Sequence, residues 1–156
     1  MRYLDIGGVR VTVLERTDYP PEKVREILRS ETLAVLGYGT QGHAQSLNLR
    51  DQGFPVILGL RPDRPSFARA VADGWQPGVD LFTIPEAATK GSVIFYLLSD
   101  AGQKEQWPVL TPFLTSGKAL VFAHGFSIVY QNQTGVHPPQ DVDVLLVAPK
   151  GSGTTL

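Results

Sequence analysis

A glycine-rich stretch at residues 37–42 has the spacing of a nucleotide-binding turn. Its sequence, GYGTQG, fits the pattern G-x-G-x-x-G and lies between an uncharged apolar run, Thr32–Leu36, and a helical pattern, Gln41–Asp51. In such a turn Gly37 would make the tight bend, Gly39 would let the backbone approach a pyrophosphate, and Gly42 would let helix and strand pack closely. The helix N-terminus would offer free N–H groups to the anion. A glycine-rich turn that binds nothing is the alternative, and the lack of a following Gly-Lys-Ser/Thr excludes an ATP-binding P-loop.

The end of the next apolar run indicates which dinucleotide the turn would take. NAD sites usually carry Asp or Glu there, about 20 residues past the glycines. Here Leu60 is followed by Arg61, and Arg64 and Ser66 come soon after. Because a guanidinium can bind a phosphate through two parallel hydrogen bonds, we predict NADP(H), with its 2′-phosphate on these residues. Asp63 would repel that phosphate unless it points away, and a solvated basic loop is the alternative.

Three further residues could act near that cofactor. His124 follows an apolar run, and its imidazole could polarise a carbonyl or relay a proton, or could merely be hydrogen-bonded in a loop. Lys150 follows another apolar run in a glycine-rich loop, where it could stabilise an oxyanion or simply lie at the surface. His43, in the first turn after the glycines, could touch the pyrophosphate or serve packing alone.

Acidic residues near the expected cleft are few. Ser99 and Asp100 follow the strongest strand pattern, where Asp100 could cap the next helix and Ser99 could line the cleft. Asp100 and Glu105 are the only acids there, too few for a magnesium cage. No cluster of His, Asp and Glu has metal-ligand spacing, so we expect no metal site in this chain.

Alternating strand and helix patterns must position these residues. Short uncharged apolar runs are typical of strands buried in a parallel sheet. The expected strands are Thr32–Leu36, Pro55–Leu60, Ser92–Leu98, Ala119–Ala123 and Val142–Ala148. The expected helices start at Pro20-Pro21 and cover Gln41–Asp51, Ser66–Asp73, Ile84–Lys90 and Lys104–Leu114, the last broken by Pro108 and Pro112. One peripheral strand or extended arm is expected over Gly7–Glu15.

This alternation predicts βαβ units and an α/β fold. We expect a single domain with a three-layer, Rossmann-like, doubly wound and mostly parallel sheet over residues 31–156. Residues 1–30 are expected to form an N-terminal arm and helix. Ligands of such sheets bind at the carboxyl ends of the strands, so the predicted site residues should meet at one edge.

Composition excludes several classes of protein. Of the 156 residues 42% are hydrophobic and 19% are charged, which suffices for a buried core and excludes a disordered segment. A net charge of −1 gives no sign of the excess of basic residues that nucleic-acid-binding proteins carry. No apolar run approaches the ~20 residues of a membrane span, and the N-terminus lacks the apolar block of a signal peptide. Because cysteine is absent, a reducing, cytoplasmic location is the default expectation.

Three segments taken together resemble one enzyme family. They are residues 35–51 (VLGYGTQGHAQSLNLRD), 122–126 (FAHGF) and 147–153 (VAPKGSG). In this order they resemble the N-terminal domain of ketol-acid reductoisomerase (acetohydroxyacid isomeroreductase) of branched-chain amino-acid biosynthesis, from about Ser30 to the last residue. The combination is more specific than the glycine pattern, because the histidine and lysine motifs follow in order at suitable strand ends.

The resemblance implies an NADPH-binding domain and assigns its residues. The implied cofactor residues are Gly37, Tyr38, Gly39, Thr40, Gln41 and Gly42 at the pyrophosphate, Arg61, Arg64 and Ser66 at the 2′-phosphate, and Leu98, Ser99, Asp100, Gln103 and Gly125 toward the ribose and nicotinamide. His124 matches the active-site histidine of the family and Lys150 the lysine near the reacting centre. Thr40 and Ser152 depart mildly from the usual Ser and Pro.

The resemblance also implies a reaction for the intact enzyme. Mg²⁺ ions assist an alkyl migration in a 2-aceto-2-hydroxy acid, and NADPH then reduces the ketone to a 2,3-dihydroxy acid. The family's metal-binding carboxylates belong to a helical C-terminal domain that this sequence does not contain, so we expect no turnover by this chain alone. We expect a small-molecule substrate, a possible homo-oligomer, and no nucleic-acid or membrane partner. The alternatives are a free-standing NADP-binding sensor or assembly module and, less in keeping with the two motifs, another Rossmann dehydrogenase.

Overall fold

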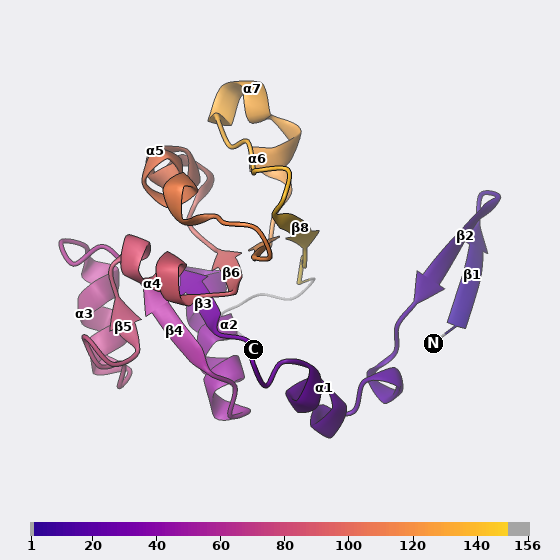
Figure 1. The fold of residues 1–156 in the computed structure, drawn as a ribbon, viewed down its shortest axis with the longest axis horizontal. Coiled ribbons are helices and arrows are strands. Elements are labelled where there is room, and N and C mark those ends of the chain that lie inside the picture. Colours follow the sequence, from indigo (N-terminus) through magenta and orange to yellow (C-terminus); the bar gives the residue numbers. More distant parts are fainter. Residues whose placement is uncertain (1, 150–156) are drawn as a thin grey trace. The chain divides into compact units, whose positions relative to one another are not determined.

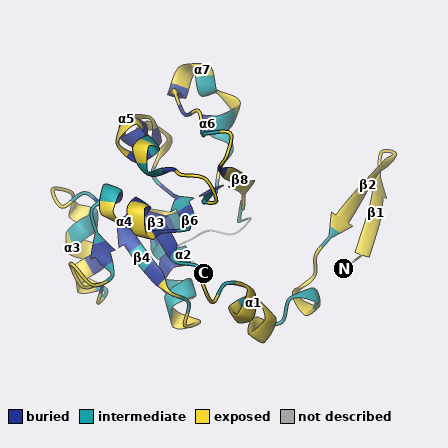
Figure 2. Ribbon diagram, viewed as in Figure 1, coloured by how far each residue is buried: buried dark blue, intermediate teal, exposed yellow. Residues whose placement is uncertain are grey.

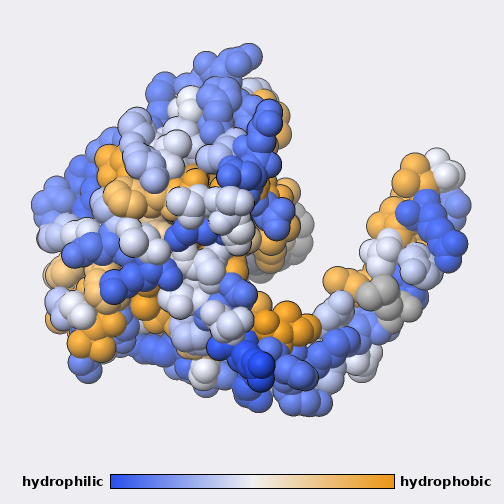
Figure 3. All heavy atoms as spheres, viewed as in Figure 1, coloured by the Kyte–Doolittle hydropathy of each residue, from blue (hydrophilic) through white to orange (hydrophobic). Residues whose placement is uncertain are grey.

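The computed structural model describes residues 2–149, and its contacts divide the chain into two compact units, Met1–Ser30 and Glu31–Leu156. The first unit contains an antiparallel hairpin of β1 (Arg2–Ile6) and β2 (Val9–Val13), a short 3-10 helix, η1 (Arg16–Asp18), and α1 (Pro21–Ile27). Figure 3 shows hydrophobic side chains on the surface of this hairpin. A strand was expected over Gly7–Glu15, and β2 lies within that range, but the expectation placed its start too early and missed its partner β1.

Two adjacent glycines explain that error. Gly7 and Gly8 have φ values of +59° and +81°, and the N–H of Gly8 donates to the Asp5 carboxylate over 2.9 Å. Residues in this left-handed region reverse the chain, and glycine adopts it at no steric cost. The Gly-Gly pair thus makes a hairpin turn and does not begin a strand.

The second unit is built on a parallel sheet of six strands within the described residues (Figure 1). The strands are β3 (Leu33–Leu36), β4 (Val56–Gly59), β5 (Leu81–Phe82), β6 (Val93–Tyr96), β7 (Ala119–Phe122) and β8 (Asp143–Leu146). Their spatial order is β5-β4-β3-β6-β7-β8, and every adjacent pair is parallel. The chain first builds outward from β3 through β4 to β5 and then returns to β6 on the other side of β3. This is the doubly wound, Rossmann-like order, with its switch point between β3 and β6, and it confirms the predicted fold class.

Helices cover both faces of the sheet. They are α2 (Thr40–Asp51), α3 (Pro65–Ala72), α4 (Ile84–Lys90), α5 (Asp100–Leu110), η2 (Thr111–Phe113), α6 (Phe126–Val129) and α7 (Gln131–Thr134). Residues of β3 alternate between two cores: Leu33 and Val35 pack in the core that contains Trp75, whereas Ala34 and Leu36 pack in the core that contains Trp107. Figure 2 shows the buried residues concentrated on β3, β4 and β6. All four residues of β3 are buried, as expected for a central strand covered on both faces.

The helix predicted over Lys104–Leu114 begins earlier and is not broken at Pro108, but it ends at Leu110, before the 3-10 turn η2 that contains Pro112. Ser99 is its N-cap, because its Oγ accepts a hydrogen bond from the N–H of Gly102 over 3.2 Å, so α5 starts at Asp100. Pro108 lies inside the helix. A proline there removes the bond to the carbonyl of Lys104, but both residues are exposed, so water can reach that carbonyl. The strand β5 was not predicted, because its two residues are too few to show a period, and neither were the one-turn helices α6 and α7.

None of the helices in residues 2–149 combines the length and the apolarity needed to cross a bilayer.

Candidate functional site

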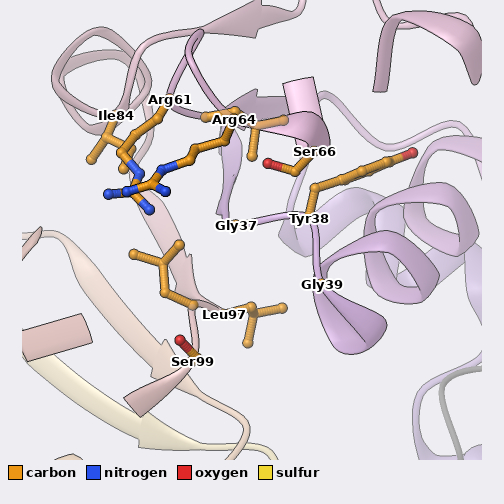
Figure 4. A pocket seen from close by; sticks show the side chains of 11 residues that line it. Gly37, Tyr38, Gly39, Arg61, Arg64, Ser66, Ile84, Leu97 and Ser99 are labelled. Carbon is orange, nitrogen blue, oxygen red and sulfur yellow. The ribbon is translucent and has the colours of Figure 1, made fainter. Parts of the chain in front are cut away.

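A cavity of about 250 Å³ lies at the carboxyl ends of β3, β4 and β6, at the switch point of the sheet (Figure 4). Three loops and the start of α4 line it. The lining residues are Gly37, Tyr38 and Gly39 after β3, Leu60, Arg61, Arg64 and Ser66 after β4, Leu97, Leu98 and Ser99 after β6, and Ile84 of α4. The residues predicted for the pyrophosphate turn and for the 2′-phosphate loop therefore share one cavity.

Glycines are required at two positions of the turn after β3. Gly37 has φ +105°, and a Cβ built there would lie 2.8 Å from the carbonyl oxygen of Leu97. A Cβ on Gly42 would overlap the carbonyl oxygen of Gly37. Any side chain at either position would push the turn away from β6 or from its own helix. The turn is thus as tight as the predicted pyrophosphate role requires, and α2 starts immediately after it at Thr40.

The Tyr38 side chain extends from this turn away from Arg61 and Arg64 (Figure 4). Its hydroxyl donates to the Asp73 carboxylate over 2.9 Å and accepts from the indole N–H of Trp75 over 3.0 Å. The Nε2 of His43 lies 3.3 Å from the same Asp73 oxygen, and its ring meets the Tyr38 ring edge-on. The imidazole of His43 therefore serves packing behind the turn. The side chains of Tyr38 and His43 are thus engaged with each other and with Asp73, which leaves the backbone of this segment as the part suited to a pyrophosphate.

The environment of Tyr38 keeps its hydroxyl protonated. The residue is only 3% exposed, and its burial, together with the hydrogen bond to the Asp73 carboxylate, raises its pKa from 10.0 to about 12. A protonated hydroxyl can donate to Asp73 while accepting from Trp75. We call Tyr38, His43, Asp73 and Trp75 the Tyr38 cluster, which ties the turn after β3 to the segment after α3.

Both arginines of the cavity have a carboxylate neighbour. The Nη1 of Arg61 lies 2.6 Å from the Oε1 of Glu105 on α5, and the Nε of Arg64 lies 3.7 Å from the Oδ2 of Asp63. Asp63 therefore lies beside the guanidinium of Arg64, although it is largely exposed and is not part of the described cavity lining. Because a guanidinium carries five N–H donors, each arginine retains donors for an anion in the cavity.

Thr40, Gln41 and Gly42 form the first turn of α2, next to the cavity lining. The side-chain oxygen of Gln41 accepts a hydrogen bond from the amide of Gln45 over 3.0 Å. Free N–H groups are characteristic of a first helical turn, so the backbone of these residues remains the part suited to an anion.

The residues after β6 divide into two groups. Leu98 and Ser99 line the cavity, whereas Asp100 is an exposed residue at the start of α5 and is not part of the described lining. Gln103 is buried, and its Nε2 donates to the carbonyls of Tyr96 and Leu98, each over 3.1 Å. Its amide thus fixes the loop that carries the cavity residues.

His124 lies at the carboxyl end of β7, one strand beyond the cavity. It is exposed, and its Nδ1 accepts the N–H of Phe126 over 3.3 Å. Gly125 is the N-cap of α6 and lines a separate apolar cavity with Phe122 and Leu146. Neither residue belongs to the described lining of the cavity at the switch point. Lys150 lies outside the described residues.

Several site residues were not predicted from the sequence. Leu60 ends one predicted strand and Leu97 is the last residue but one of another, so their position at the cavity could have been inferred from the strand ends alone. The position of Ile84 at the cavity could not be inferred in this way, because the strand before it, β5, is too short to be recognised in the sequence. Glu105 was placed near the cleft, but its pairing with Arg61, 44 residues away, has no local signal.

Comparison with known proteins decides the family. The family described as acetohydroxy acid isomeroreductase, NADPH-binding domain, matches residues 27–156. The chain belongs to the ketol-acid reductoisomerase family. Over all 156 residues it is 54% identical to the probable mitochondrial ketol-acid reductoisomerase of Schizosaccharomyces pombe, covering 39% of that protein. It is 51% identical over the same length to the mitochondrial enzyme of Saccharomyces cerevisiae, covering 40% of it.

Relatives with a different cofactor also occur among these ketol-acid reductoisomerases. A Desulfosudis oleivorans relative named ketol-acid reductoisomerase (NAD(+)) is 51% identical over 156 residues, which are 44% of its length. The solved structure of an NADH-preferring ketol-acid reductoisomerase from an uncultured archean superposes with a TM-score of 0.80 at 38% identity, covering 93% of this chain and 42% of that one. Binding of NAD(P)H is therefore common to the family, while the preference differs between members. The chain spans about two fifths of the length of these relatives.

Within residues 2–149, no group of three or more His, Asp or Glu side chains is arranged to hold a metal ion.

Proposed function

We propose that this chain is the NADPH-binding part of a ketol-acid reductoisomerase. The observation that carries the proposal is the shared cavity at the switch point, which joins the glycine turn at residues 37–42 to Arg61, Arg64 and Ser66. A dinucleotide needs a close backbone approach at its pyrophosphate and cations at a 2′-phosphate. The cavity offers both, and the family match supports the same ligand.

Each part of the cavity has a proposed task. The backbone at Gly39 and the first turn of α2 bind the pyrophosphate, because nothing lies within 4 Å of a Cβ position on Gly39 and the helix N-terminus favours an anion. Arg61, Arg64 and Ser66 bind the 2′-phosphate. Leu97 and Leu98 supply the apolar wall for the nicotinamide end. NADPH, when bound, supplies the hydride that reduces a ketone.

The substrate proposed for the whole protein is a small 2-aceto-2-hydroxy acid that is rearranged and reduced to a 2,3-dihydroxy acid. His124, exposed at the end of β7, is proposed to hold or move a proton at a substrate oxygen, and Lys150 to lie near the reacting centre. The described residues offer no carboxylate cluster for Mg²⁺. The metal ligands are therefore proposed to belong to the part of the family's length that this chain does not span.

Preference for NADPH over NADH is a separate proposal. Arg61, Arg64 and Ser66 favour the extra phosphate, and no carboxylate stands at the end of β4. The carboxylates of Glu105 and Asp63 oppose the binding of that phosphate, because they carry the same sign of charge. We propose that the arginines outweigh the two carboxylates, since each guanidinium can form several charge-assisted hydrogen bonds to one phosphate.

The compartment and the assembly state stay predictions. The cytoplasmic location expected from the absence of cysteine is unconfirmed, and the two fungal relatives are named as mitochondrial enzymes. A homo-oligomer is likewise still only expected.

Equilibrium titration tests the proposed function. The chain is titrated separately with NADPH and with NADH while the fluorescence of the reduced nicotinamide is followed. We expect saturable binding of both, tighter for NADPH. Absence of saturable binding of either dinucleotide would contradict the proposal, and equal affinities would contradict the preference alone.

A further inference from the structure

The ion pair between Arg61 and Glu105 is the closer of the two arginine–carboxylate pairs at the cavity. Its atoms are 2.6 Å apart, against 3.7 Å for Arg64 and Asp63. The Arg61 side chain is 27% exposed and that of Glu105 is 55% exposed, whereas Arg64 and Asp63 are 50% and 73% exposed. Solvent and salt weaken the attraction between charges most when both are fully exposed. The ion pair of Arg61 with Glu105 is therefore stronger than that of Arg64 with Asp63.

This pair connects a residue of the cavity lining, Arg61, to the neighbouring helix α5. Arg61 extends from the loop after β4, and Glu105 lies on α5, directly after the loop from β6 that carries Leu97 and Ser99. Figure 4 shows the side chains of Arg61 and Arg64 on one side of the cavity, with Leu97 and Ser99 on the other. Glu105 therefore contacts an arginine that the proposed function assigns to the 2′-phosphate, and it does so from α5, whose preceding loop carries Leu97 and Ser99.

We propose that Glu105 is a specificity-determining residue that competes with the 2′-phosphate of NADP(H) for Arg61. The inference rests on the proposed binding of a dinucleotide in this cavity. A phosphate monoester carries up to two negative charges, so it both needs the donors of Arg61 and is repelled by the carboxylate. NADH carries a neutral 2′-hydroxyl in place of the phosphate, so it neither needs the donors of Arg61 nor is repelled by the carboxylate of Glu105. Glu105 thereby lowers the affinity for NADPH and leaves that for NADH unchanged.

Glu105→Gln isolates the charge. Glutamine keeps the length of the side chain but pairs only weakly with a guanidinium, so Arg61 becomes available to the phosphate. Because the pair is partly exposed, we expect the dissociation constant for NADPH to fall by about threefold to tenfold and that for NADH to change by less than about twofold. The gain for NADPH should shrink as salt is raised, since salt screens partly exposed charges.

Two matched variants complete the experiment. Asp51→Asn changes the net charge by the same amount at the opposite end of α2 from the glycine turn, and it should alter neither affinity. In an Arg61→Ala background, Glu105→Gln should improve NADPH binding by less than about twofold, because the competition for Arg61 is gone and only the direct repulsion between the carboxylate and the phosphate remains. Thermal unfolding of each variant shows that the fold is retained, as expected for a substitution at a largely exposed side chain.

The outcomes separate this inference from the proposed function. If the unaltered chain binds NADPH but Glu105→Gln leaves that affinity unchanged, only the inference fails. Weaker NADPH binding by the variant would show that Glu105 orients Arg61, and weaker NADH binding would show that the carboxylate accepts a ribose hydroxyl. Either result overturns the competition. If the unaltered chain binds neither dinucleotide, the proposed function fails and the inference fails with it.

Discussion

Arg64 is the residue on which the proposed preference for NADPH most directly depends. It lines the cavity and is half exposed, and its carboxylate neighbour, Asp63, is 3.7 Å away. We predict that Arg64→Ala weakens NADPH binding by about tenfold or more, because a charge-assisted hydrogen bond contributes about 1.5–3 kcal/mol. The affinity for NADH should change little. Titration of the variant with both dinucleotides checks this, and an equal loss for both would place Arg64 away from the 2′-phosphate.

Tyr38 is predicted to stabilise the fold in a pH-dependent way. Tyr38→Phe leaves the buried indole N–H of Trp75 without its acceptor, so the free energy of unfolding at neutral pH should fall by about 1–3 kcal/mol. The tyrosine pKa is about 12 in the folded chain and 10.0 in the unfolded one, so the folded state holds this proton more tightly. Its contribution is complete below pH 10 and is lost as the pH rises toward 12.

The difference in stability between the unaltered chain and Tyr38→Phe should therefore narrow above pH 10. Urea unfolding at several pH values from 8 to 11 measures it. Tyr130→Phe, at an exposed tyrosine, is the matched control and should behave like the unaltered chain. A difference that stays constant or widens above pH 10 would show that Tyr38 does not keep its proton in this way.

At the residue scale, sequence reasoning predicted backbone and charge roles better than side-chain direction. Arg61, Arg64 and Ser66 were predicted from their place after a strand, and all three line the cavity. The direction of Tyr38 depends on Asp73 and Trp75, which are 35 and 37 residues away. No local pattern encodes such a contact.

The strand–turn–helix element from β3 to α2 is predicted to tolerate a methyl group at one glycine and not at another. Gly42→Ala would place a Cβ against the carbonyl of Gly37, so it should destabilise the chain by about 1–3 kcal/mol and disrupt NADPH binding. Gly39→Ala has open space around its Cβ and an ordinary φ of −77°, so it should fold normally. It should nevertheless weaken NADPH binding, because the methyl group occupies the space proposed for the pyrophosphate.

Thermal unfolding and NADPH titration of both variants check this pair. An unchanged midpoint for Gly42→Ala would show that the turn is less tight than its geometry indicates. Normal NADPH binding by Gly39→Ala would place the pyrophosphate elsewhere.

The elements that hold the site were the predictable ones. An uncharged run that ends in glycine identified β3, and proline and glycine punctuation identified α3 and α4. Two features of the elements were not predicted. One is the hairpin turn at Gly7-Gly8, and the other is the capping of α5 by Ser99, which starts that helix at Asp100. Both depend on a particular backbone conformation or hydrogen bond, which residue type alone does not specify.

At the scale of the whole molecule, the alternation of strands and helices was enough to predict a doubly wound sheet, because crossover chirality and layer packing leave few other topologies. The proximity of the loops after β3, β4 and β6 followed from that topology. His124 lies beside the cavity and is not part of its described lining. This position could not be inferred from the sequence, because it depends on the course of the loop after β7.

The chain is predicted to bind cofactor without catalysing the reaction. With 2-acetolactate, Mg²⁺ and NADPH, we expect no oxidation of NADPH above the rate without protein, because the described residues provide no metal ligands and the chain spans about two fifths of its relatives. The absorbance of NADPH measures this. Turnover by the purified chain would overturn the proposal that it is catalytically incomplete.

The position of the bound cofactor is the central claim, and nuclear magnetic resonance of the labelled chain during titration with NADPH tests it most directly. We predict that the largest changes in amide chemical shift occur in two segments, residues 37–42 and 61–66, and that the second segment changes much less with NADH. Saturable shifts confined to other parts of the sheet, or identical shifts with both dinucleotides, would contradict it.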